Sequence, residues 1–216
     1  MRPLSASADR ERALALFSAS RETLQRLDLY VELLGRWRRV TNLIGESTFS
    51  EIWTRHIADS AQLLALAPHA RKWLDLGSGA GLPGLVIAIQ LADVPGAEVH
   101  CVESDKRKCA FLREAARAAS APVVVQASRI EELRLEDFPP IDIVTSRALA
   151  PLGKLLELAD PWLSRGAVGL FPKGRGWNRE VQEADAESQF QIEPFRSSVD
   201  PDSQILRVSP RAQATR

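Results

Sequence analysis

Residues Trp73–Gly84, with the sequence WLDLGSGAGLPG, decide the fold of this chain. Their pattern predicts a strand that ends at Leu76, a glycine-rich loop and the beginning of a helix. The next apolar run ends at Glu103. A strand, a glycine loop, a helix, a second strand and an acidic residue, in this order, are typical of a nucleoside site at the carboxyl edge of a parallel sheet. Glycines let the backbone approach the ligand closely, and the carboxylate can accept from both ribose hydroxyls.

The loop leaves two kinds of nucleoside ligand open. Gly79–Gly84 matches the G-x-G-x-x-G pattern of dinucleotide sites. However, the turn begins earlier, at Gly77, and Asp75 stands two residues before it. A nearby carboxylate disfavours an anionic pyrophosphate and favours a cationic ligand. S-adenosylmethionine carries a sulfonium and an ammonium and no phosphate, so we favour it over a dinucleotide.

Composition sets broad limits. The chain has 216 residues, 45% hydrophobic and 26% charged, which is ordinary for a soluble globular protein and sufficient for one α/β domain with an appendage. Its formal net charge of zero argues against nucleic-acid binding through bulk charge alone, but leaves a local basic face open. The first ten residues lack a signal-peptide core, and no run approaches the ~20 apolar residues of a membrane span. We expect a cytoplasmic protein without membrane contact.

The two cysteines, Cys101 and Cys109, fall in a strand pattern and a helix pattern. Without C-x-x-C spacing, neither a zinc site nor a disulfide framework is expected. We predict two reduced core thiols and no metal.

The first third of the chain is predicted to be helical, over residues 8–66. One apolar helical stripe consists of Leu24, Leu27, Val31 and Leu34. The pattern breaks at Asn42, and Thr48–Glu51 fits a capping box that would open another helix through Leu66. We expect residues 1–70 to form a helical cap within a single domain, because about sixty residues bury only a marginal core alone.

From residue 71 strands and helices alternate. The predicted strands are Trp73–Leu76, Val99–Glu103, Val123–Gln126, Ile141–Ser146 and Ala167–Phe171. The predicted helical segments are Leu82–Leu91, Lys106–Ala119, a short turn at Ile130–Leu133, Leu152–Leu163 and Val181–Glu187. This alternation predicts a parallel sheet with right-handed crossovers.

The chain ends with two further strand patterns, Phe190–Phe195 and Gln204–Val208, joined by the turn residues Asp200–Asp202. A mostly parallel sheet that ends in an antiparallel hairpin resembles a class I methyltransferase more than a dehydrogenase. The predicted fold is therefore α/β and Rossmann-like over residues 71–210, with the N-terminal helical cap before it. We expect residues 211–216 to be a frayed tail.

Candidate ligand residues follow the strands. Glu103 stands about 20 residues after the glycine loop, as a ribose-binding acid does. Ile130 and Glu131 follow the third strand, where an apolar side chain can cover an adenine. A solvated helix cap is the alternative for either acid, and Asp75 is either a cofactor contact or a strand-end carboxylate.

Basic residues end the fourth and fifth strands. Arg147 can pair with the carboxylate of a cofactor or with an RNA phosphate. Lys173 and Arg175, with Arg179, would form a phosphate-binding rim, or else an ordinary solvated turn.

One helix carries the pairs Arg55/Asp59 and His56/Ser60, each at i,i+4 spacing. If it packs near the glycine loop, His56 lines the site; otherwise this histidine is structural.

Absent motifs also narrow the chemistry. The sequence has no Asn/Asp-Pro-Pro-Tyr/Phe motif for an exocyclic amine and no Pro-Cys nucleophile for a pyrimidine. No general base is evident, and guanine N7 needs none because its lone pair is free. Catalysis there would depend on positioning and electrostatics.

The motifs together resemble the bacterial small-subunit ribosomal RNA guanine-N7 methyltransferases, the RsmG or GidB family. They occur in order between about Tyr30 and Lys173: Asn42-Leu43, Arg55–Ser60, Asp75–Gly84, Ser128–Glu132, Ser146–Ala148 and Lys173-Gly174.

This resemblance implies methylation of N7 of a guanine in the decoding-region loop of 16S rRNA, guanine 527 in the usual description of the family. The cofactor would be S-adenosylmethionine and its product S-adenosylhomocysteine. The partner would be 16S rRNA in the small subunit or in an assembly intermediate, and we expect a monomer. The resemblance puts Gly77 and Leu82 in the cofactor loop, Glu103 at the ribose, Ile130 and Glu131 at the adenine, and Arg147 near cofactor and target.

The resulting candidate set has three parts. Arg147 is the catalytic candidate, through positioning and charge. The cofactor candidates are Gly77, Gly79, Leu82, Glu103, Ile130, Glu131 and Arg147, and the RNA candidates are Arg55, His56, Lys173 and Arg175. Three alternatives stay open: a dinucleotide-dependent oxidoreductase, a non-catalytic RNA-binding or assembly protein, and a methyltransferase for proteins or small molecules.

Overall fold

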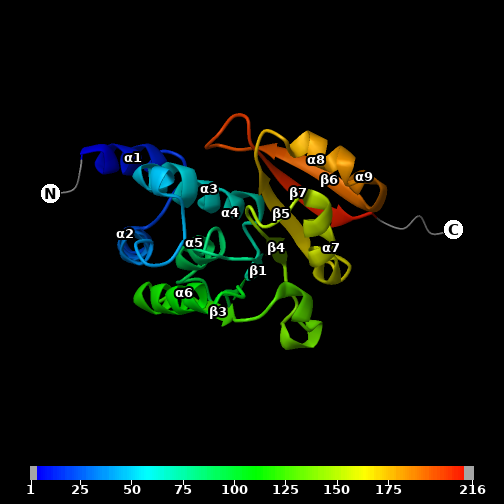
Figure 1. The fold of residues 1–216 in the computed structure, drawn as a ribbon, viewed down its shortest axis with the longest axis horizontal. Helices are drawn as coiled ribbons and strands as arrows, with labels where there is room; N and C mark the ends of the chain where they lie inside the picture. Colours follow the sequence, from blue (N-terminus) through cyan, green and yellow to red (C-terminus); the bar gives the residue numbers. More distant parts are fainter. Residues whose placement is uncertain (1–3, 212–216) are drawn as a thin grey trace.

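A seven-stranded sheet organises the computed structural model, which describes residues 4–211 (Figure 1). Its strand order is β3-β2-β1-β4-β5-β7-β6, with β1 to β5 parallel and β7 antiparallel to both neighbours. The strands are β1 (Lys72–Leu76), β2 (Glu98–Val102), β3 (Val123–Gln126), β4 (Ile143–Thr145), β5 (Val168–Lys173), β6 (Phe190–Arg196) and β7 (Gln204–Pro210). The predicted Rossmann-like sheet with a terminal antiparallel hairpin is confirmed. Of the predicted tail at 211–216, residues 212–216 lie outside the described residues.

Helices cover both faces of the sheet. The connecting elements are α5 (Gly84–Gln90), α6 (Lys106–Ala118), the 3-10 turns η3 (Ile130–Glu132) and η4 (Leu135–Asp137), α7 (Leu152–Leu163), α8 (Trp177–Glu183) and α9 (Ala186–Gln189). Successive strand residues point to opposite faces. Trp73 therefore joins a core with α2, α5 and α6, whereas Leu74 joins a second core with α7 and α8.

Two N-terminal helices, α1 (Leu4–Leu14) and α2 (Arg21–Trp37), lie beside the first of these cores. Ser20 caps α2 by accepting from the Thr23 amide at 3.1 Å. The predicted stripe faces inward, with Leu27 and Leu34 fully buried. On the same helix, the Tyr30 hydroxyl donates to the carbonyl of Ala80 at 2.7 Å, which ties α2 directly to the glycine loop.

The predicted capping box at Thr48–Glu51 is wrong. These residues lie in a 3-10 helix, η1 (Glu46–Glu51), and the Thr48 hydroxyl donates to the Gly45 carbonyl at 2.9 Å. The following segment consists of a π-helical turn, η2 (Trp53–Ala58), and the short helices α3 (Asp59–Ala61) and α4 (Leu63–Leu66). Its first amides, at Trp53 and Thr54, donate instead to the buried carboxylate of Asp9 on α1. A distant carboxylate thus replaces the local cap.

Within the described range, no helix is both long and apolar enough to cross a membrane.

Candidate functional site

The glycine loop turns between β1 and α5 through left-handed backbone. Gly77, Gly79 and Gly81 have φ angles of 71°, 54° and 84°, a region that favours glycine. The turn therefore begins at Gly77, as its spacing predicts. At Gly77 a side chain would also collide with Leu149, since an added Cβ would lie 2.6 Å from Cδ1 of that leucine.

Glu103 joins this loop to the end of β2. Its Oε2 accepts from the Gly79 amide at 3.0 Å, and its Oε1 accepts from the Asp105 amide at 2.8 Å. The side chain is largely buried at the sheet edge. A carboxylate offers about four lone-pair sites, so acceptor capacity remains for ligand hydroxyls.

Asp75 lies behind the loop and is fully buried. Its Oδ2 accepts from the Gly84 amide, the first residue of α5, at 3.1 Å. Within the described residues its Oδ1 has no hydrogen-bond partner, and burial raises the pKa of Asp75 to about 6. Carboxylates thus occupy an amide of the loop and the first amide of α5, where a pyrophosphate would bind. This arrangement disfavours a dinucleotide.

A cavity of about 450 Å³ opens in front of the loop, and we call it the glycine-loop cavity. It is lined by Gly77, Gly79, Val102, Glu103, Ser104, Lys108, Ser128, Arg129, Ile130, Glu131, Ala148, Leu149, Ala150, Lys154 and Leu158. Five of the predicted cofactor residues therefore share one cavity. Leu82 is buried in the core and is not among these lining residues, and Arg147 lies on a second cavity. The cofactor contacts of Leu82 and Arg147 stay predictions.

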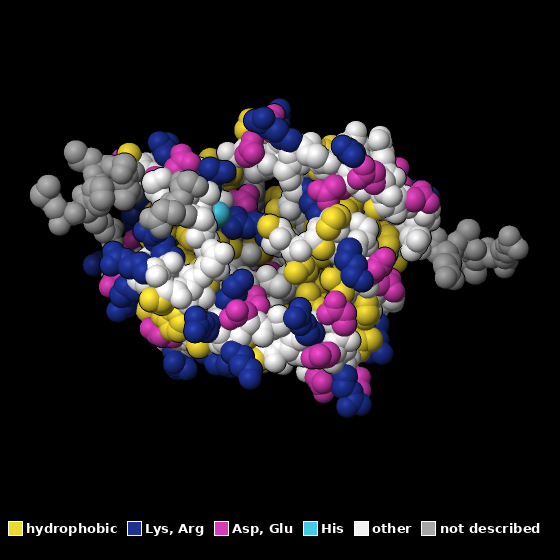
Figure 2. Space-filling view, in the orientation of Figure 1, with side chains coloured by type: hydrophobic (Ala, Val, Ile, Leu, Met, Phe, Trp, Pro, Cys, Tyr) yellow, Lys and Arg dark blue, Asp and Glu magenta, His cyan; other side chains and the backbone are white. Residues whose placement is uncertain are grey.

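The second cavity, of about 590 Å³, is called here the Arg147 cavity. It is lined by Asp59, Arg147, Ala148, Leu149, Ala150, Pro151, Pro172, Lys173, Gly174, Glu180, Glu183, Ser197, Ser203, Gln204 and Ile205. Residues 148–150 line both cavities, so the loop after β4 is their shared wall. Ala148 adopts a left-handed φ of 54°, which costs an alanine about 1–2 kcal/mol. Figure 2 shows this face hollowed near its centre, with basic and acidic side chains around the hollow.

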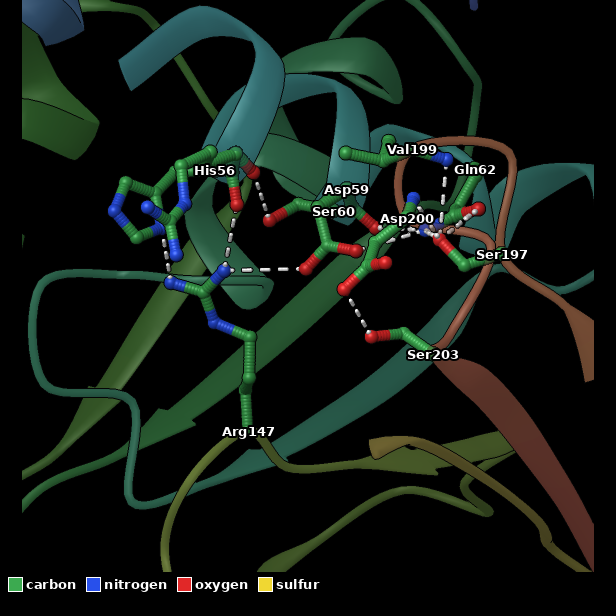
Figure 3. A network of polar contacts seen from close by, with 10 residues as sticks. His56, Asp59, Ser60, Gln62, Arg147, Ser197, Val199, Asp200 and Ser203 are labelled. Carbon is green, nitrogen blue, oxygen red and sulfur yellow. Dashed lines mark hydrogen bonds and ion pairs between the residues drawn. The ribbon is translucent and has the colours of Figure 1, made fainter. Parts of the chain in front are cut away.

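Arg147 points from this loop toward the segment that carries His56 and Asp59 (Figure 3). Its Nη1 donates to Asp59 Oδ2 and to the Arg55 carbonyl, both at 3.2 Å. Its Nη2 lies 2.6 Å from His56 Nδ1. An arginine only donates, so His56 Nδ1 accepts and its ring is neutral. This segment therefore packs against Arg147, but His56 is not among the residues that line either cavity, and its place in the site stays a prediction. Of the two predicted pairs, Ser60 donates to the His56 carbonyl at 2.7 Å, whereas Arg55 pairs with Glu51 rather than with Asp59.

Burial shifts the pKa of both partners of Arg147. The pKa of His56 is lowered to about 3, first by burial and then by the positive charges of Arg147 and Arg55. Burial also raises the pKa of Asp59, while Arg147 opposes that rise.

The other basic candidates have acidic partners. Lys173 Nζ donates to the Ala150 carbonyl at 3.1 Å and to Glu180 Oε2 at 2.8 Å. Glu180 also accepts from the Leu152 amide at the beginning of α7. Lys173 thus fixes the shared wall from β5. Arg175 is exposed and paired with Asp202, and Arg55 is exposed near Glu51. RNA contact by these residues stays a prediction.

Sequence reasoning missed Asp9, Gln62, Tyr30 and Glu180 as parts of this site. Asp9, Gln62 and Glu180 carry no local motif. Tyr30 offers a weak signal, because the chain's single tyrosine interrupts an apolar stripe. Cys101 and Cys109 are both buried free thiols, as predicted. Among the described residues, no cluster of His, Cys, Asp and Glu has the composition and proximity of a metal site.

Comparison with known proteins settles the family. The family model for rRNA small subunit methyltransferase G (GidB) matches residues 23–202. Ribosomal RNA small subunit methyltransferase G of Methylorubrum populi is 51% identical over 200 residues, covering 93% of this chain and 94% of that protein. The chain belongs to the GidB family. A Bradyrhizobium protein of the same name is 51% identical over 188 residues, covering 87% of this chain and 84% of its own.

Solved structures support the fold of this GidB member. A mutant of MtNAS in complex with S-adenosylmethionine superposes with a TM-score of 0.58 at 16% identity, covering 95% of this chain and 77% of that chain. The likeness is to a class I methyltransferase fold. The family and the fold together show that the protein is a methyltransferase and exclude the oxidoreductase alternative.

Proposed function

We propose that this protein transfers a methyl group from S-adenosylmethionine to N7 of a guanine in the decoding-region loop of 16S rRNA. The observation that carries the proposal is the pair of cavities with one shared wall at residues 148–150. A donor in the glycine-loop cavity and a base in the Arg147 cavity would meet at that wall. Both volumes fall within the ~300–1,000 Å³ of ordinary ligand pockets.

The residues of the glycine-loop cavity fit a cationic nucleoside. Glu103 presents a carboxylate to ribose hydroxyls, and Ile130 presents an apolar surface to a base. Gly79 lines the cavity, and an added Cβ there would meet only the Gly77 carbonyl, at 3.8 Å, so the glycine leaves space in front of the loop. When bound, adenosylmethionine supplies an activated methyl on its sulfonium.

The Arg147 cavity supplies charge and orientation rather than a base. His56 Nδ1 already accepts from Arg147, and Asp59 is paired with the same guanidinium. Neither group is free to remove a proton, and guanine N7 has none to lose. Arg147, held from three sides, is preorganised toward the phosphate or carbonyl oxygen of a target nucleotide.

A mass-mapped methylation assay tests the proposal. Small subunits from cells that lack the modification would be incubated with the protein and labelled adenosylmethionine, and the product nucleoside identified. A single 7-methylguanosine in 16S rRNA supports the function. Label in another nucleoside, or only in protein, overturns it.

The state of the substrate is a further part of the proposal. The same assay on naked 16S rRNA and on assembly intermediates would rank these against mature subunits. We also propose that the protein acts as a cytoplasmic monomer, which sedimentation of the purified chain would test.

A further inference from the structure

The loop between β6 and β7, residues 197–203, reaches from the terminal hairpin back to the segment of α3 and α4 (Figure 1). Ser197 and Ser203 from this loop line the Arg147 cavity. The loop therefore forms part of the wall of that cavity, together with the shared wall at 148–150. Its one direct side-chain connection to the Arg147 network, among the hydrogen bonds of the described residues, is Gln62.

Gln62 lies between α3 and α4 and uses both ends of its amide. Nε2 donates to Asp59 Oδ1 at 2.9 Å and to Ser197 Oγ at 3.2 Å. Oε1 accepts from the Ser198 amide at 2.8 Å and from the Ser198 hydroxyl at 3.0 Å. A backbone amide only donates and a carboxylate accepts, so this orientation of the Gln62 amide is the one that satisfies both sides.

Asp59 is the residue that links Gln62 to Arg147. Its Oδ1 accepts from Gln62 and its Oδ2 from Arg147, so one carboxylate holds both side chains (Figure 3). Because this carboxylate is mostly buried, each donor helps to keep it charged. Loss of the Gln62 donor would weaken the hold of Asp59 on the guanidinium.

The loop itself is closed by its own hydrogen bonds. Ser197 Oγ accepts from the amides of Val199 and Asp200, and Asp200 accepts from the Asp202 amide and the Ser203 hydroxyl. The Ser197 amide donates to the Ser203 carbonyl at 3.1 Å. Because these bonds close the loop on itself, we expect it to move as a unit. A nucleotide that displaced its cavity side would then also displace Ser197 and Ser198, which bond to Gln62.

We propose that Gln62 is a positioning residue that couples the 197–203 loop, as the wall facing the target nucleotide, to the orientation of Arg147 through Asp59. This inference rests on the proposed function, because the group that would press on the loop is a nucleotide of the rRNA. Among the side-chain hydrogen bonds of the described residues, none joins Gln62 to the glycine loop or to Glu103. Its role is therefore confined to the acceptor side of the reaction.

Kinetics of Gln62→Ala on unmodified small subunits test this role. We expect kcat to fall about tenfold or more, with the Kd of adenosylhomocysteine within twofold of the parent. Gln191→Ala is the matched control, since Gln191 is exposed on β6 and bonded to Glu193. A parallel loss of cofactor affinity and melting temperature in Gln62→Ala would indicate general destabilisation and overturn the proposal.

A double-mutant cycle shows whether Gln62 acts on Arg147 through Asp59 or independently of it. If Gln62 acts through Asp59, Gln62→Ala should cost little further kcat in an Asp59→Asn background. Additive losses would overturn the coupling.

Hydrogen exchange supplies a readout that does not depend on activity. Gln62→Ala should raise exchange in peptides covering both 197–203 and 147–151, and a change confined to 197–203 would reject the coupling. If the parent protein methylates no subunit, the proposed function fails, and these exchange data still decide the coupling.

Discussion

Asp59 and Arg147 lie 88 residues apart in the sequence, yet Oδ2 of the aspartate accepts from Nη1 of the arginine at 3.2 Å. Both side chains are about four-fifths buried, at 18% and 20% exposure. Such a pair fixes a guanidinium far more firmly than an exposed pair does, because less water competes for either charge. The site thus holds its positive charge in place before a substrate arrives.

Arg147→Ala should lower kcat for rRNA methylation by about 100-fold, the usual cost of one preorganised electrostatic group. It should also lower the free energy of unfolding by about 1–3 kcal/mol, because Asp59 keeps a buried charge without its partner. Urea denaturation and single-turnover kinetics measure the two effects. Arg134→Ala, which removes an exposed arginine paired with Glu136, is the charge-matched control.

Adding Asp59→Asn to Arg147→Ala separates stability from catalysis. The double variant should recover stability, since the unpaired charge is gone, and still fail to methylate. Recovery of activity in it would reject the catalytic role of Arg147.

Gly79→Ala should weaken adenosylhomocysteine binding, because a methyl group would enter the glycine-loop cavity. It should also cost about 1–2 kcal/mol of stability, since alanine disfavours its φ of 54°. Gly96→Ala is the matched control: its φ is 76° and an added Cβ meets nothing within 4 Å. Calorimetry should show the binding loss in Gly79→Ala alone. Equal binding losses in both variants would mean that strain, not the cavity, is responsible.

Local patterns in the sequence predicted most of the fold. Strands β1, β2, β4 and β5 lie within about two residues of their expected bounds, because buried parallel strands leave continuous apolar runs between turn residues. The glycine loop was predictable for the same reason: left-handed turns need glycine at fixed positions. Helix α5 begins at Gly84 rather than Leu82, because Leu82 and Pro83 still belong to the turn.

The supports of the site were not predictable from local sequence. Asp9 caps a turn 44 residues away, and Gln62 bonds to a loop 136 residues away. Such contacts depend on how α1 and the hairpin pack, and no spacing records them. The same holds for the capping box, in which the Thr48 hydroxyl would accept from the Glu51 amide. In the structure this hydroxyl donates to the Gly45 carbonyl instead.

His56 makes stability depend on pH in a defined window. Its pKa is about 3 in the folded protein against an ordinary 6.5, so the folded state disfavours the protonated ring. The neutral His56 ring therefore makes its full contribution to the free energy of unfolding above pH 6.5, and this contribution is lost as the pH falls toward 3. Burial is the main cause of the lowered pKa; Arg147 and Arg55 add to it by repelling the proton, while Asp9 attracts the proton less strongly.

His56→Gln should flatten the fall in unfolding free energy across this window, because glutamine can still accept from Arg147 but binds no proton. Urea denaturation at a series of pH values measures the slope, with the exposed His69→Gln as control. Asp75 acts in the opposite direction: its raised pKa, about 6, makes stability fall as pH rises from about 4 to 6. The parent and His56→Gln must therefore be compared by the slope of the free energy of unfolding against pH. An unchanged slope in His56→Gln would show that another group controls the acid transition.

Lys173, at the end of β5, has two candidate roles: holding the shared wall or contacting the RNA. Its side chain is 10% exposed and its ammonium bonds to Ala150 and Glu180, so the structure favours a role in holding the shared wall. Lys173→Met keeps the stem and removes the charge. It should then cost about 1–3 kcal/mol of stability and lower both cofactor affinity and kcat, because Ala150 lines both cavities.

Direct RNA contact by Lys173 would give a different result. KM for subunits would rise and the salt dependence of binding would weaken by about one charge, with stability and cofactor affinity unchanged. Arg175→Ala is the comparison variant, because Arg175 is 82% exposed and its Asp202 partner lies on the loop beside the Arg147 cavity. Arg175→Ala should raise KM for subunits and weaken the salt dependence of binding, with stability and cofactor affinity unchanged. A Lys173→Met protein that matches Arg175→Ala in all four measurements would assign Lys173 to the RNA rather than to the wall.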